Sequence, residues 1–377
     1  RDVLLLSTQE LDFTRMRQCL TALAAESIGL PAAMAEPVVV LINGRFFGLR
    51  YDIERIDSKF RKRVLLDRTG PLSRLNGDDH WRSDWSLRGR RIGKSGDLLS
   101  VNELVRQVNR LHPGEVESFF RSRFYLQKFI NRLAFSAVRG ELDPAPTDFF
   151  LLRDSRNGKW EMFREDYRNS DWGIRDLEKE IRELTSGELE RALFPLCQRA
   201  GAPRREAWLV LFTRFFKVPA FRELYLQRVE ALLREELSPG RFDVLVDRTA
   251  AKVASSLEDW RLIWPYDEGA TLESSVEKIK SAHRRRSLAL KGLIAEVRAR
   301  PTEPVCFSAW SLHPAIGAAW VELANRSGGP VRLASYRFSE GFSENPGLVS
   351  LREVLAPGAS FRIELPGGAA ASRRAAG

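Results

Sequence analysis

The sequence predicts an α+β chain in two parts, and three observations support that prediction. Apolar residues recur at helical spacing over residues 101–139 and 174–299. Two pairs of short β-rich runs are each joined by an Asn-Gly dipeptide, at residues 43–44 and 157–158, which is typical of tight hairpins. After Pro301 the helical pattern gives way to short runs between turn residues, which indicates a separate β-rich part.

The composition is that of an ordinary folded protein. Of the 377 residues, 44% are hydrophobic and 29% are charged, which excludes a disordered chain and allows a sizeable buried core. The net charge is +10, but 49 of the 60 basic residues are Arg spread along the whole chain. The charge therefore does not favour nucleic-acid binding over a general Arg-rich composition, and a basic nucleic-acid-binding protein is kept only as a third alternative.

The cysteines and histidines show no metal or disulfide pattern. The three Cys lie far apart and share no metal-type spacing with the four His. The longest uncharged stretch, residues 304–321, contains Pro and Gly and would make a poor membrane helix. We therefore expect no zinc site, no disulfide framework and no transmembrane segment. The chain begins at Arg1 without a signal-like stretch, from which we expect that upstream sequence, such as an export signal, was removed.

The first part, residues 1–300, begins with a helix and a hairpin. Apolar residues at helical spacing, followed by Gly and Pro, predict a helix over residues 9–28. Residues 38–42 and 46–53 are the strands of the first hairpin. Residues 67–100 are polar and rich in Gly, and we interpret them as a long loop or insertion.

Helical segments then alternate with the second hairpin. Residues 101–139 are predicted to be helical with an aromatic face. Residues 149–152 and 160–163 are predicted to be short strands around the second Asn-Gly turn. Residues 174–299 return to the helical pattern and form an α-rich block.

The second part is predicted to be a small β-sandwich over residues 305–366. Its short β-rich runs lie between turn residues, at 320–323, 331–338, 349–355 and 361–365. Residues 367–377 contain only Ala, Gly, Ser and Arg, and we expect a disordered tail there.

Three carboxylates around the second hairpin are the best candidates for chemistry. Asp143 and Asp148 lie in the loop before the hairpin, five residues apart, and Asp166 follows it. Phosphoryl transfer needs a carboxylate that orients the attacking hydroxyl and further oxygen ligands that hold magnesium against the phosphates. The five-residue step equals the Asp-to-Asn step of a kinase catalytic loop. By spacing alone, the alternative that these are solvated loop carboxylates stays open.

Four segments together resemble the CotH kinase family, the spore-coat-type atypical protein kinases. The most specific is residues 39–57, VVLINGRFFGLRYDIERID, a hairpin with Asn-Gly, an aromatic, Gly, and then Glu shortly before an acid. Residues 12–18 resemble the family's early helix start, and residues 143–160 resemble its catalytic loop and following ribbon. Residues 211–233 are similar to its C-lobe helices.

The resemblance implies a fold and an activity. The fold would be an atypical protein-kinase-like α+β fold with a helical C-lobe, similar over residues 9–296, followed by a lamin-tail-like β-sandwich over residues 310–365. The activity would be transfer of the γ-phosphoryl group of ATP, with Mg²⁺, to a protein hydroxyl. The partner would be a protein substrate or a coat or surface protein. The resemblance favours an extracellular or cell-surface location.

The resemblance also implies roles for single residues. Asp143 would accept or orient the hydroxyl proton, and Asp148 with Asp166 would ligate magnesium and so hold the nucleotide. Glu54, at the end of the first hairpin, would border the adenine of ATP; the alternative is an edge-strand carboxylate paired with Arg. Arg17 would tether its helix to the catalytic loop; the alternative is a solvated helix charge.

Several positions depart from the family pattern. Asp148 stands where the family has Asn, and Arg168 stands where it has a second acid. An Arg two residues from a magnesium ligand opposes the metal by like charge unless it turns away. The glycine-rich phosphate cover and the phosphate-binding Lys would lie before Arg1, so we expect an incomplete N-lobe. Asp171, in Asp-Trp-Gly, is a second candidate for the metal acid. These substitutions keep open a pseudokinase or surface scaffold without catalysis.

Overall fold

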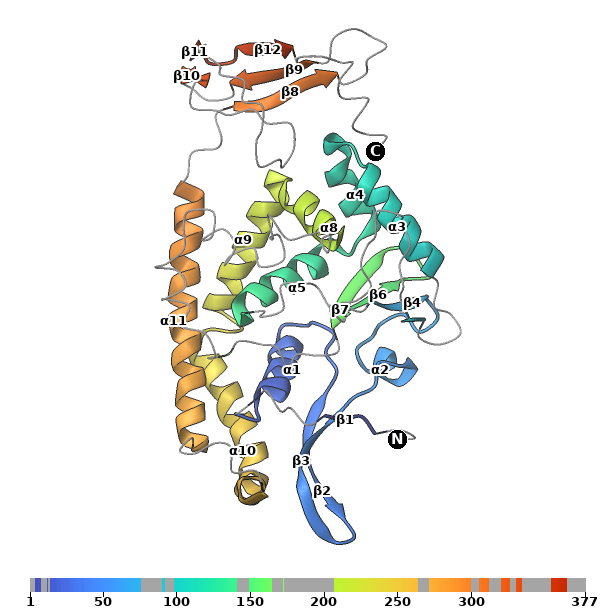
Figure 1. Ribbon diagram of the computed structural model, residues 1–377, viewed down its shortest axis with the longest axis vertical. Coiled ribbons are helices and arrows are strands. Elements are labelled where there is room, and N and C mark those ends of the chain that lie inside the picture. Colours follow the sequence, from blue (N-terminus) through green and yellow to red (C-terminus); the bar gives the residue numbers. More distant parts are fainter. Residues whose placement is uncertain are drawn as a thin grey trace, which may run out of the picture. The chain divides into compact units, whose positions relative to one another are not determined.

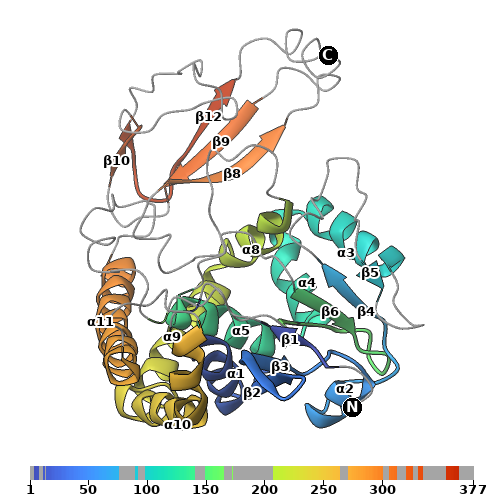
Figure 2. The ribbon, with the colours of Figure 1, turned by 60° about the horizontal axis from the view of Figure 1, so that its bottom comes forward.

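The computed structural model divides the chain into two compact units, Arg1–Ala295 (unit 1) and Glu296–Gly377 (unit 2). Figures 1 and 2 show the elements of each unit in two orientations. The residues that the structure describes are 4–7, 12, 14–75, 90–91, 98–140, 149–164, 172, 207–263, 271–299, 305–311, 320–325, 330–333 and 354–364.

The first hairpin is confirmed and belongs to a three-stranded antiparallel sheet in the order β1-β3-β2. Asn43 and Gly44 both have positive φ, 52° and 75°, which is the backbone that a two-residue type I′ turn requires. Helix α2 follows β3, and the carboxylate of Asp57 caps its start by accepting from the backbone N–H groups of Lys59 and Phe60. The elements are β1 (Leu6–Ser7), β2 (Ala35–Ile42), β3 (Arg45–Ile53) and α2 (Ser58–Arg63).

Helix α1 (Arg17–Ser27) is shorter than the helix predicted over residues 9–28. The carboxylate of Asp12 accepts hydrogen bonds from the backbone N–H groups of Thr14 (3.0 Å) and Arg17 (2.8 Å), and Arg15 has a φ of 54°. A turn closed by a short polar side chain therefore occupies the positions where the helix was predicted to begin. Within α1, Cys19 is buried and free, and burial raises the pKa of its thiol to about 11.

The second sheet of unit 1 has four antiparallel strands in the order β5-β4-β6-β7. The second hairpin is confirmed as β6–β7, with Gly158 at a φ of 71° in its turn. The prediction of one polar loop over residues 67–100 is wrong in part, because β4 pairs with β6 inside this sheet and helix α3 begins at Leu98. The strands are β4 (Leu72–Leu75), β5 (Arg90–Arg91), β6 (Phe149–Arg153) and β7 (Trp160–Arg164).

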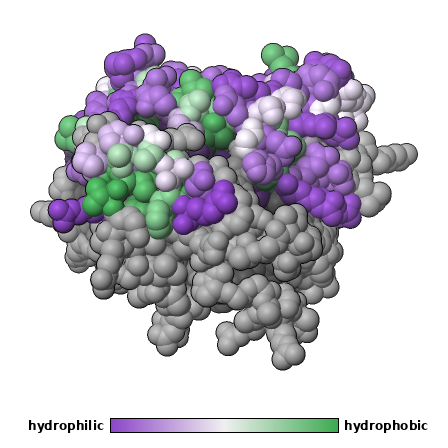
Figure 3. Space-filling model, turned by 90° about the horizontal axis from the view of Figure 1, so that it is seen from above, coloured by the Kyte–Doolittle hydropathy of each residue, from purple (hydrophilic) through white to green (hydrophobic). Residues whose placement is uncertain are grey.

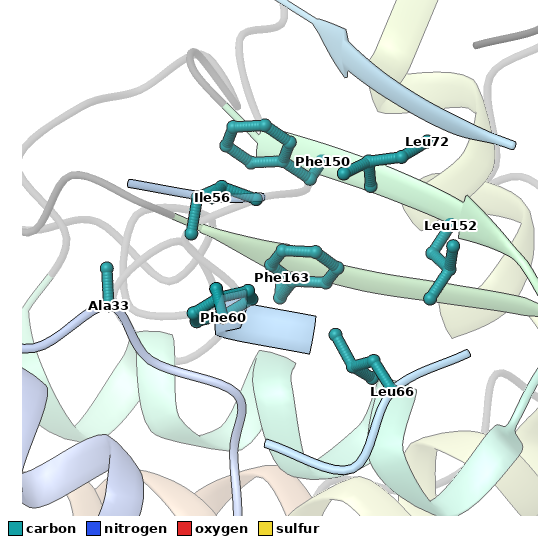
Figure 4. Packing of buried hydrophobic residues seen from close by; sticks show 8 residues of the cluster. All are labelled: Ala33, Ile56, Phe60, Leu66, Leu72, Phe150, Leu152 and Phe163. Atoms are coloured by element: carbon teal, nitrogen blue, oxygen red, sulfur yellow. The ribbon is translucent and has the colours of Figure 1, made fainter. Parts of the chain in front are cut away.

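A hydrophobic core joins this sheet to α2 and to the segment that precedes β2 (Figure 4). Phe150 and Phe163 stack with ring centroids 5.4 Å apart, and Phe60 of α2 lies 5.7 Å from Phe163. Facing aromatic rings at these distances contribute beyond the area they bury. The buried members are Ala33, Ile56, Phe60, Leu66, Leu72, Phe150, Leu152 and Phe163.

The helical region predicted over residues 101–139 is confirmed but divided. The backbone of Phe124 is extended and pairs with Trp160 of β7, and Tyr125 donates its N–H to the carbonyl of Trp160 at 3.1 Å. Pairing with a strand edge thus interrupts the helical pattern at this point. The elements are α3 (Leu98–Arg110), a 3₁₀ turn (Pro113–Glu115), α4 (Val116–Arg123) and α5 (Leu126–Arg139).

In the described part of the α-rich block that the sequence predicts after the second hairpin, the chain forms four helices. Helix α9 packs along α5 (Figures 1 and 2), and rings of α4, α5, α8 and α9 form one aromatic cluster around Phe120. Among the described residues, no helix combines the length and apolar character needed to cross a bilayer. The helices are α8 (Ala207–Phe216), α9 (Pro219–Arg234), α10 (Pro239–Ile263) and α11 (Leu272–Ala299).

Unit 2 contains a three-stranded antiparallel sheet, β12-β9-β8, and a two-stranded pair, β10–β11. Asn325 links them, since its backbone N–H donates to Ala359 (2.9 Å) and its side-chain amide donates to Leu355 (2.8 Å). Strand β8 was not predicted, and the predicted tail lies outside the described residues. The strands are β8 (Val305–Ser311), β9 (Trp320–Asn325), β10 (Val331–Arg332), β11 (Val354–Leu355) and β12 (Ser360–Glu364).

Candidate functional site

The three candidate acids, Asp143, Asp148 and Asp166, lie outside the described residues, as do Arg168 and Asp171. The described residues nevertheless show where the chain enters and leaves the segments that carry these acids. Helix α5 ends in Gly140, whose left-handed backbone (φ 69°) is the usual helix stop, and β6 resumes the described chain at residue 149. Strand β7 ends at residue 164, and the next described residue is Trp172.

The register of the β6–β7 ribbon brings these segments to one place. Phe149, the first residue of β6, pairs with Arg164, the last residue of β7. Paired Cα atoms in antiparallel strands are about 4.5–5.5 Å apart. The segments 141–148 and 165–171 therefore join the ribbon side by side, at the end opposite the turn. We call this end of the ribbon the open end.

The segment before β2 also reaches the open end. Ala32 forms a parallel bridge with Arg164, on the side of β7 that faces away from β6. The carbonyl of Ala32 accepts a hydrogen bond from Nη2 of Arg63 at 2.6 Å. Arg63 thus connects the last turn of α2 to the residue that flanks the open end.

Glu54 lies within this same set of contacts. Nε of Arg63 is 3.0 and 3.1 Å from the two carboxylate oxygens of Glu54, and the backbone N–H of Met34 donates to the same carboxylate at 3.2 Å. Arg63 also donates to Glu26 of α1 at 2.8 Å. The hydrogen bonds to Glu54, together with both negative charges, raise the pKa of Arg63. The Arg-paired carboxylate that the sequence left as an alternative is therefore present, and both oxygens are engaged within the chain.

Arg17 does not project into solvent, so the solvated alternative is wrong. Its guanidinium Nε lies 2.9 Å from Oδ1 of Asp12, and both side chains are buried. A buried pair of this kind is stabilised by the further hydrogen bonds that complete it. Here the hydroxyl of Thr14 donates to Asp12 at 2.6 Å, and two backbone N–H groups donate as well. The tether from Arg17 to the catalytic loop stays a prediction.

Trp172 anchors the far end of the segment 165–171, a role that sequence reasoning missed. Its Nε1 donates to the hydroxyl of Thr21 on α1 at 2.6 Å. Its ring lies 4.6 Å from Phe242 of α10 and 5.8 Å from His283 of α11. Three helices therefore hold the point where this segment ends. A Trp within a polar stretch of sequence could have indicated this anchor, but only its neighbour Asp171 was considered from the sequence.

His283 is a neutral member of this anchor. Its Nε2 lies 2.8 Å from the carbonyl of Leu237, its ring stacks on Phe242 at 3.9 Å, and its Nδ1 has no hydrogen-bond partner among the residues that the structure describes. Burial lowers the pKa of His283 to about 4, and the nearby positive charges of Arg284 and Arg286 act in the same direction. The imidazole is uncharged at neutral pH.

Three buried Arg side chains lie on the two elements that precede the acid-bearing segments, α5 and β7. Arg132 and Arg139 lie seven residues apart on α5 with Ser136 between them, and Arg164 is the last residue of β7. All three are buried. Nη1 of Arg132 donates to the hydroxyl of Ser136 at 2.7 Å. Fixed positive charge next to the ends of the acid-bearing segments suits a site that handles anions. The seven-residue spacing of Arg132 and Arg139 on an apolar helix face could have indicated these buried Arg side chains from the sequence.

The turn end of the same ribbon has its own buried acids. Asp67 accepts from the backbone N–H groups of Thr69 (3.0 Å), Gly70 (2.9 Å) and Ser155 (2.7 Å). Burial alone would raise the pKa of Asp67, but the hydrogen bonds from Ser155 and Thr69 outweigh it and hold the pKa well below its usual range. Gly70 is required here, because a Cβ would lie 2.1 Å from the carbonyl oxygen of Arg153.

Asp154 completes the turn end. It accepts from the hydroxyl of Tyr125 at 2.5 Å and from Nη2 of Arg156 at 2.6 Å. The Arg156 hydrogen bond is the main cause that lowers the pKa of Asp154 to about 2, assisted by Tyr125. Among the described residues, no three side chains of the metal-binding types gather into a possible metal site. The carboxylates of the turn end are thus engaged in holding the chain.

Unit 1 is therefore a mixed helix-and-strand domain in which two acid-bearing segments start at one ribbon end beside a helical block. The chain belongs to the CotH kinase protein family, whose pattern matches residues 1–290. A comparison with curated proteins gives no match. One similar solved structure is the crystal structure of a Helicobacter pylori proinflammatory kinase, CtkA. It is 10% identical, with 76% of this chain and 90% of that chain covered, and has a TM-score of 0.32. At that score no detail is transferred from it.

Proposed function

We propose that this chain is a protein kinase of the CotH type, which transfers the γ-phosphoryl group of ATP to a protein hydroxyl. The register of Phe149 opposite Arg164 is the observation that carries the proposal, because it starts both acid-bearing segments at the same ribbon end. Family membership over residues 1–290 supports a kinase-type protein.

The candidate acids have the chemistry that this reaction needs. Asp143 would accept or orient the proton of the attacking hydroxyl. Asp148 and Asp166 would hold Mg²⁺, since carboxylate oxygens are the ligands that this hard cation prefers. The bound metal would neutralise charge on the phosphates. The buried Arg164 at the root of the segment that carries Asp166 would keep that segment in place.

Glu54 would act at the nucleotide through the backbone that it fixes. Its carboxylate is already bound by Arg63 and Met34, and its own N–H donates to the carbonyl of Met34 at 2.7 Å. These contacts hold the end of β3 against the segment that contains Ala32, which flanks the open end. We propose that this fixed strand end borders the adenine of ATP.

The domain limits belong to the same proposal. Residues 1–300 would form the kinase-like domain with a helical C-lobe. Residues 305–366 would form a lamin-tail-like β-sandwich that contacts a protein substrate or a coat or surface protein. An extracellular or cell-surface setting fits such a partner.

A scaffold without catalysis is the second candidate function. Arg168 stands where the family has an acid, and the carboxylate of Glu54 is engaged by Arg63 rather than available to a ligand. In a scaffold, the same fold would present a surface and the open end would carry no chemistry.

Replacement of the acids tests the proposal. In the full-length protein, Asp143→Asn or Asp166→Asn should lower phosphate transfer from labelled Mg-ATP to a generic protein substrate by on the order of a hundredfold or more, since base and metal ligands act as a unit. Asp247→Asn is the matched control, because Asp247 is exposed and, among the described residues, its ion pair is with Lys280 of α11 at 2.6 Å. Equal rates in all three variants would leave the scaffold as the better proposal.

Arg168→Asp separates the two candidates further. If the site is active but has too little negative charge to bind Mg²⁺ well, an added acid should raise its affinity for magnesium. In a scaffold it should change nothing. Calorimetry with Mg²⁺ and ATP on the wild type and on this variant measures the difference.

A further inference from the structure

The tip of the β2–β3 hairpin is apolar, basic and uncovered. Residues 37–51 contain two Arg and no acid. Four large apolar side chains there are exposed: Leu41 by 59%, Ile42 by 48%, Phe47 by 47% and Val39 by 44%. Figure 1 shows the hairpin extending away from the helices of its unit. The face drawn in Figure 3 is different, because its described residues are mostly hydrophilic and its hydrophobic side chains form limited groups.

Both faces of the hairpin tip are exposed. Successive side chains of a strand point to opposite faces, so Leu41 and Ile42 lie on different faces, and both are exposed. A protein partner that packs on one face of a sheet, or that adds a strand to its edge, would leave one of these side chains in water. A medium that surrounds the tip covers both. An apolar tip of this form therefore favours a lipid phase over a docked protein.

The charges select the kind of lipid surface. Arg45 is exposed next to the turn, and neither Arg45 nor Arg50 forms an ion pair with a described acid. The guanidinium of Arg50 lies over the ring of Phe47, 5.2 Å from its centroid, and Nη1 donates to the carbonyl of Leu49. A cation beside an exposed aromatic ring can reach lipid phosphates while the ring enters the acyl boundary.

We propose that the tip of the β2–β3 hairpin inserts into the interface of an anionic membrane. Leu41, Ile42 and Phe47 enter the boundary between headgroups and acyl chains, and Arg45 and Arg50 contact the anionic headgroups. Interfacial elements insert about 5–10 Å, which is the length of roughly two to three strand residues. The Asn43-Gly44 turn fixes the tip before it meets the surface, so little ordering is needed on binding.

Vesicle sedimentation with the full chain tests the proposal. The chain should bind vesicles of 70% phosphatidylcholine and 30% phosphatidylserine, and bind phosphatidylcholine vesicles weakly. Leu41→Asp/Ile42→Asp should lower the partition coefficient by about tenfold or more, since two buried apolar side chains are lost. Val244→Asp/Leu288→Asp is the matched control, because those side chains, on α10 and α11, are even more exposed than Leu41 and Ile42, by 65% and 71%.

A second variant covers the case in which the double Asp variant does not fold. Phe47→Trp keeps an aromatic ring, and its emission, taken as the difference from the wild type with its nine Trp, should shift to the blue and be quenched by brominated lipids on binding. Arg45→Gln/Arg50→Gln should remove the preference for phosphatidylserine. The proposal is overturned if the wild type ignores both vesicles, if the hairpin and control variants bind equally, or if ultracentrifugation shows that the tip joins two copies instead. None of these readouts depends on phosphate transfer.

Discussion

The two ends of the β6–β7 ribbon use acidic and basic groups in different ways. At the turn end, Asp67 and Asp154 are buried and their oxygens are occupied by N–H and O–H donors. At the open end, the buried Arg164 lies at the root of a segment that carries Asp166. One end holds the chain together, and the other end leads to the segments where chemistry is proposed.

The difference teaches that a lowered pKa does not locate an active site. Perturbed pKa values cluster at functional sites, but hydrogen-bond networks in structural loops produce them too. The pKa of Asp154 is lowered to about 2 by Arg156 and Tyr125, and both of its carboxylate oxygens already accept hydrogen bonds from these residues. The ribbon register is the better guide here, because it follows from chain connectivity.

Removal of the Asp67 carboxylate is the strongest test of the turn end. Asp67→Ala should lower the free energy of unfolding by about 3–5 kcal/mol, because the N–H groups of Thr69, Gly70 and Ser155 lose their acceptor in a buried place. Urea unfolding measures the loss. Glu103→Ala is the control, since Glu103 is exposed and pairs within α3. A loss as small as that of the control would contradict the structural role of the turn end.

As the pH falls, the stabilisation from the anchor around His283 should be lost at a higher pH than the stabilisation from the turn end. The pKa of His283 is 6.5 when unfolded and about 4 when folded, so protons favour the unfolded chain in that interval. The stabilisation is complete above pH 6.5 and falls by on the order of 3 kcal/mol as the pH approaches 4. His283→Gln, which keeps a donor for Leu237, should flatten the slope of stability against pH in this window. An unchanged slope would mean that another group controls it.

Asp154 should act in a lower window. Its folded pKa of about 2 lies below the unfolded value of 3.8, so its contribution is present above pH 4 and lost as the pH falls toward 2. Asp154→Asn should lower stability at pH 7 by about 2 kcal/mol through loss of charge-assisted hydrogen bonds, and should remove that acid dependence. The rate of phosphate transfer per folded molecule should stay unchanged, in contrast to Asp143→Asn.

Replacement of Arg63, which joins the open end to α1 and α2, should have the smallest effect. Arg63→Lys keeps the charge but cannot contact Glu54, Glu26 and the Ala32 carbonyl together, so stability should fall by about 1 kcal/mol. Arg121→Lys is the control, because Arg121 is exposed and its ion pair in the described part of the chain is with exposed Glu117. If the open end borders ATP, the KM for ATP should rise with little change in kcat. A change in stability alone would limit Arg63 to a structural role.

Both hairpins and the helical block could be predicted because their signals are local. Asn-Gly turns and helical periodicity act over a few residues, and the structure confirms them at Asn43 and Gly158. The strand at Leu72–Leu75 was missed because it is short and lies in polar sequence, and only its pairing with β6 makes it a strand. The break at Phe124 was missed for the same reason, since a distant strand causes it.

The candidate site divides in the same way. Arg pairing at Glu54 was foreseen as an alternative, because an Arg is common near an edge carboxylate. Its partner Arg63 follows nine residues later, but the contact of Arg63 with the Ala32 carbonyl and the bridge from Ala32 to Arg164 join segments that are far apart in sequence, which spacing does not reveal. The roles of Asp143, Asp148 and Asp166 stay predictions that the ribbon register supports.

The buried thiol of Cys19 can report on the opening of unit 1. Only thiolates are alkylated rapidly, and the pKa of about 11 leaves almost none at neutral pH while α1 stays packed. Labelling at this position therefore waits for α1 to separate from its neighbours. Thr21, two residues further along α1, accepts the hydrogen bond of Trp172. The rate of Cys19 labelling would therefore measure how often the helix that anchors the proposed site separates from its neighbours.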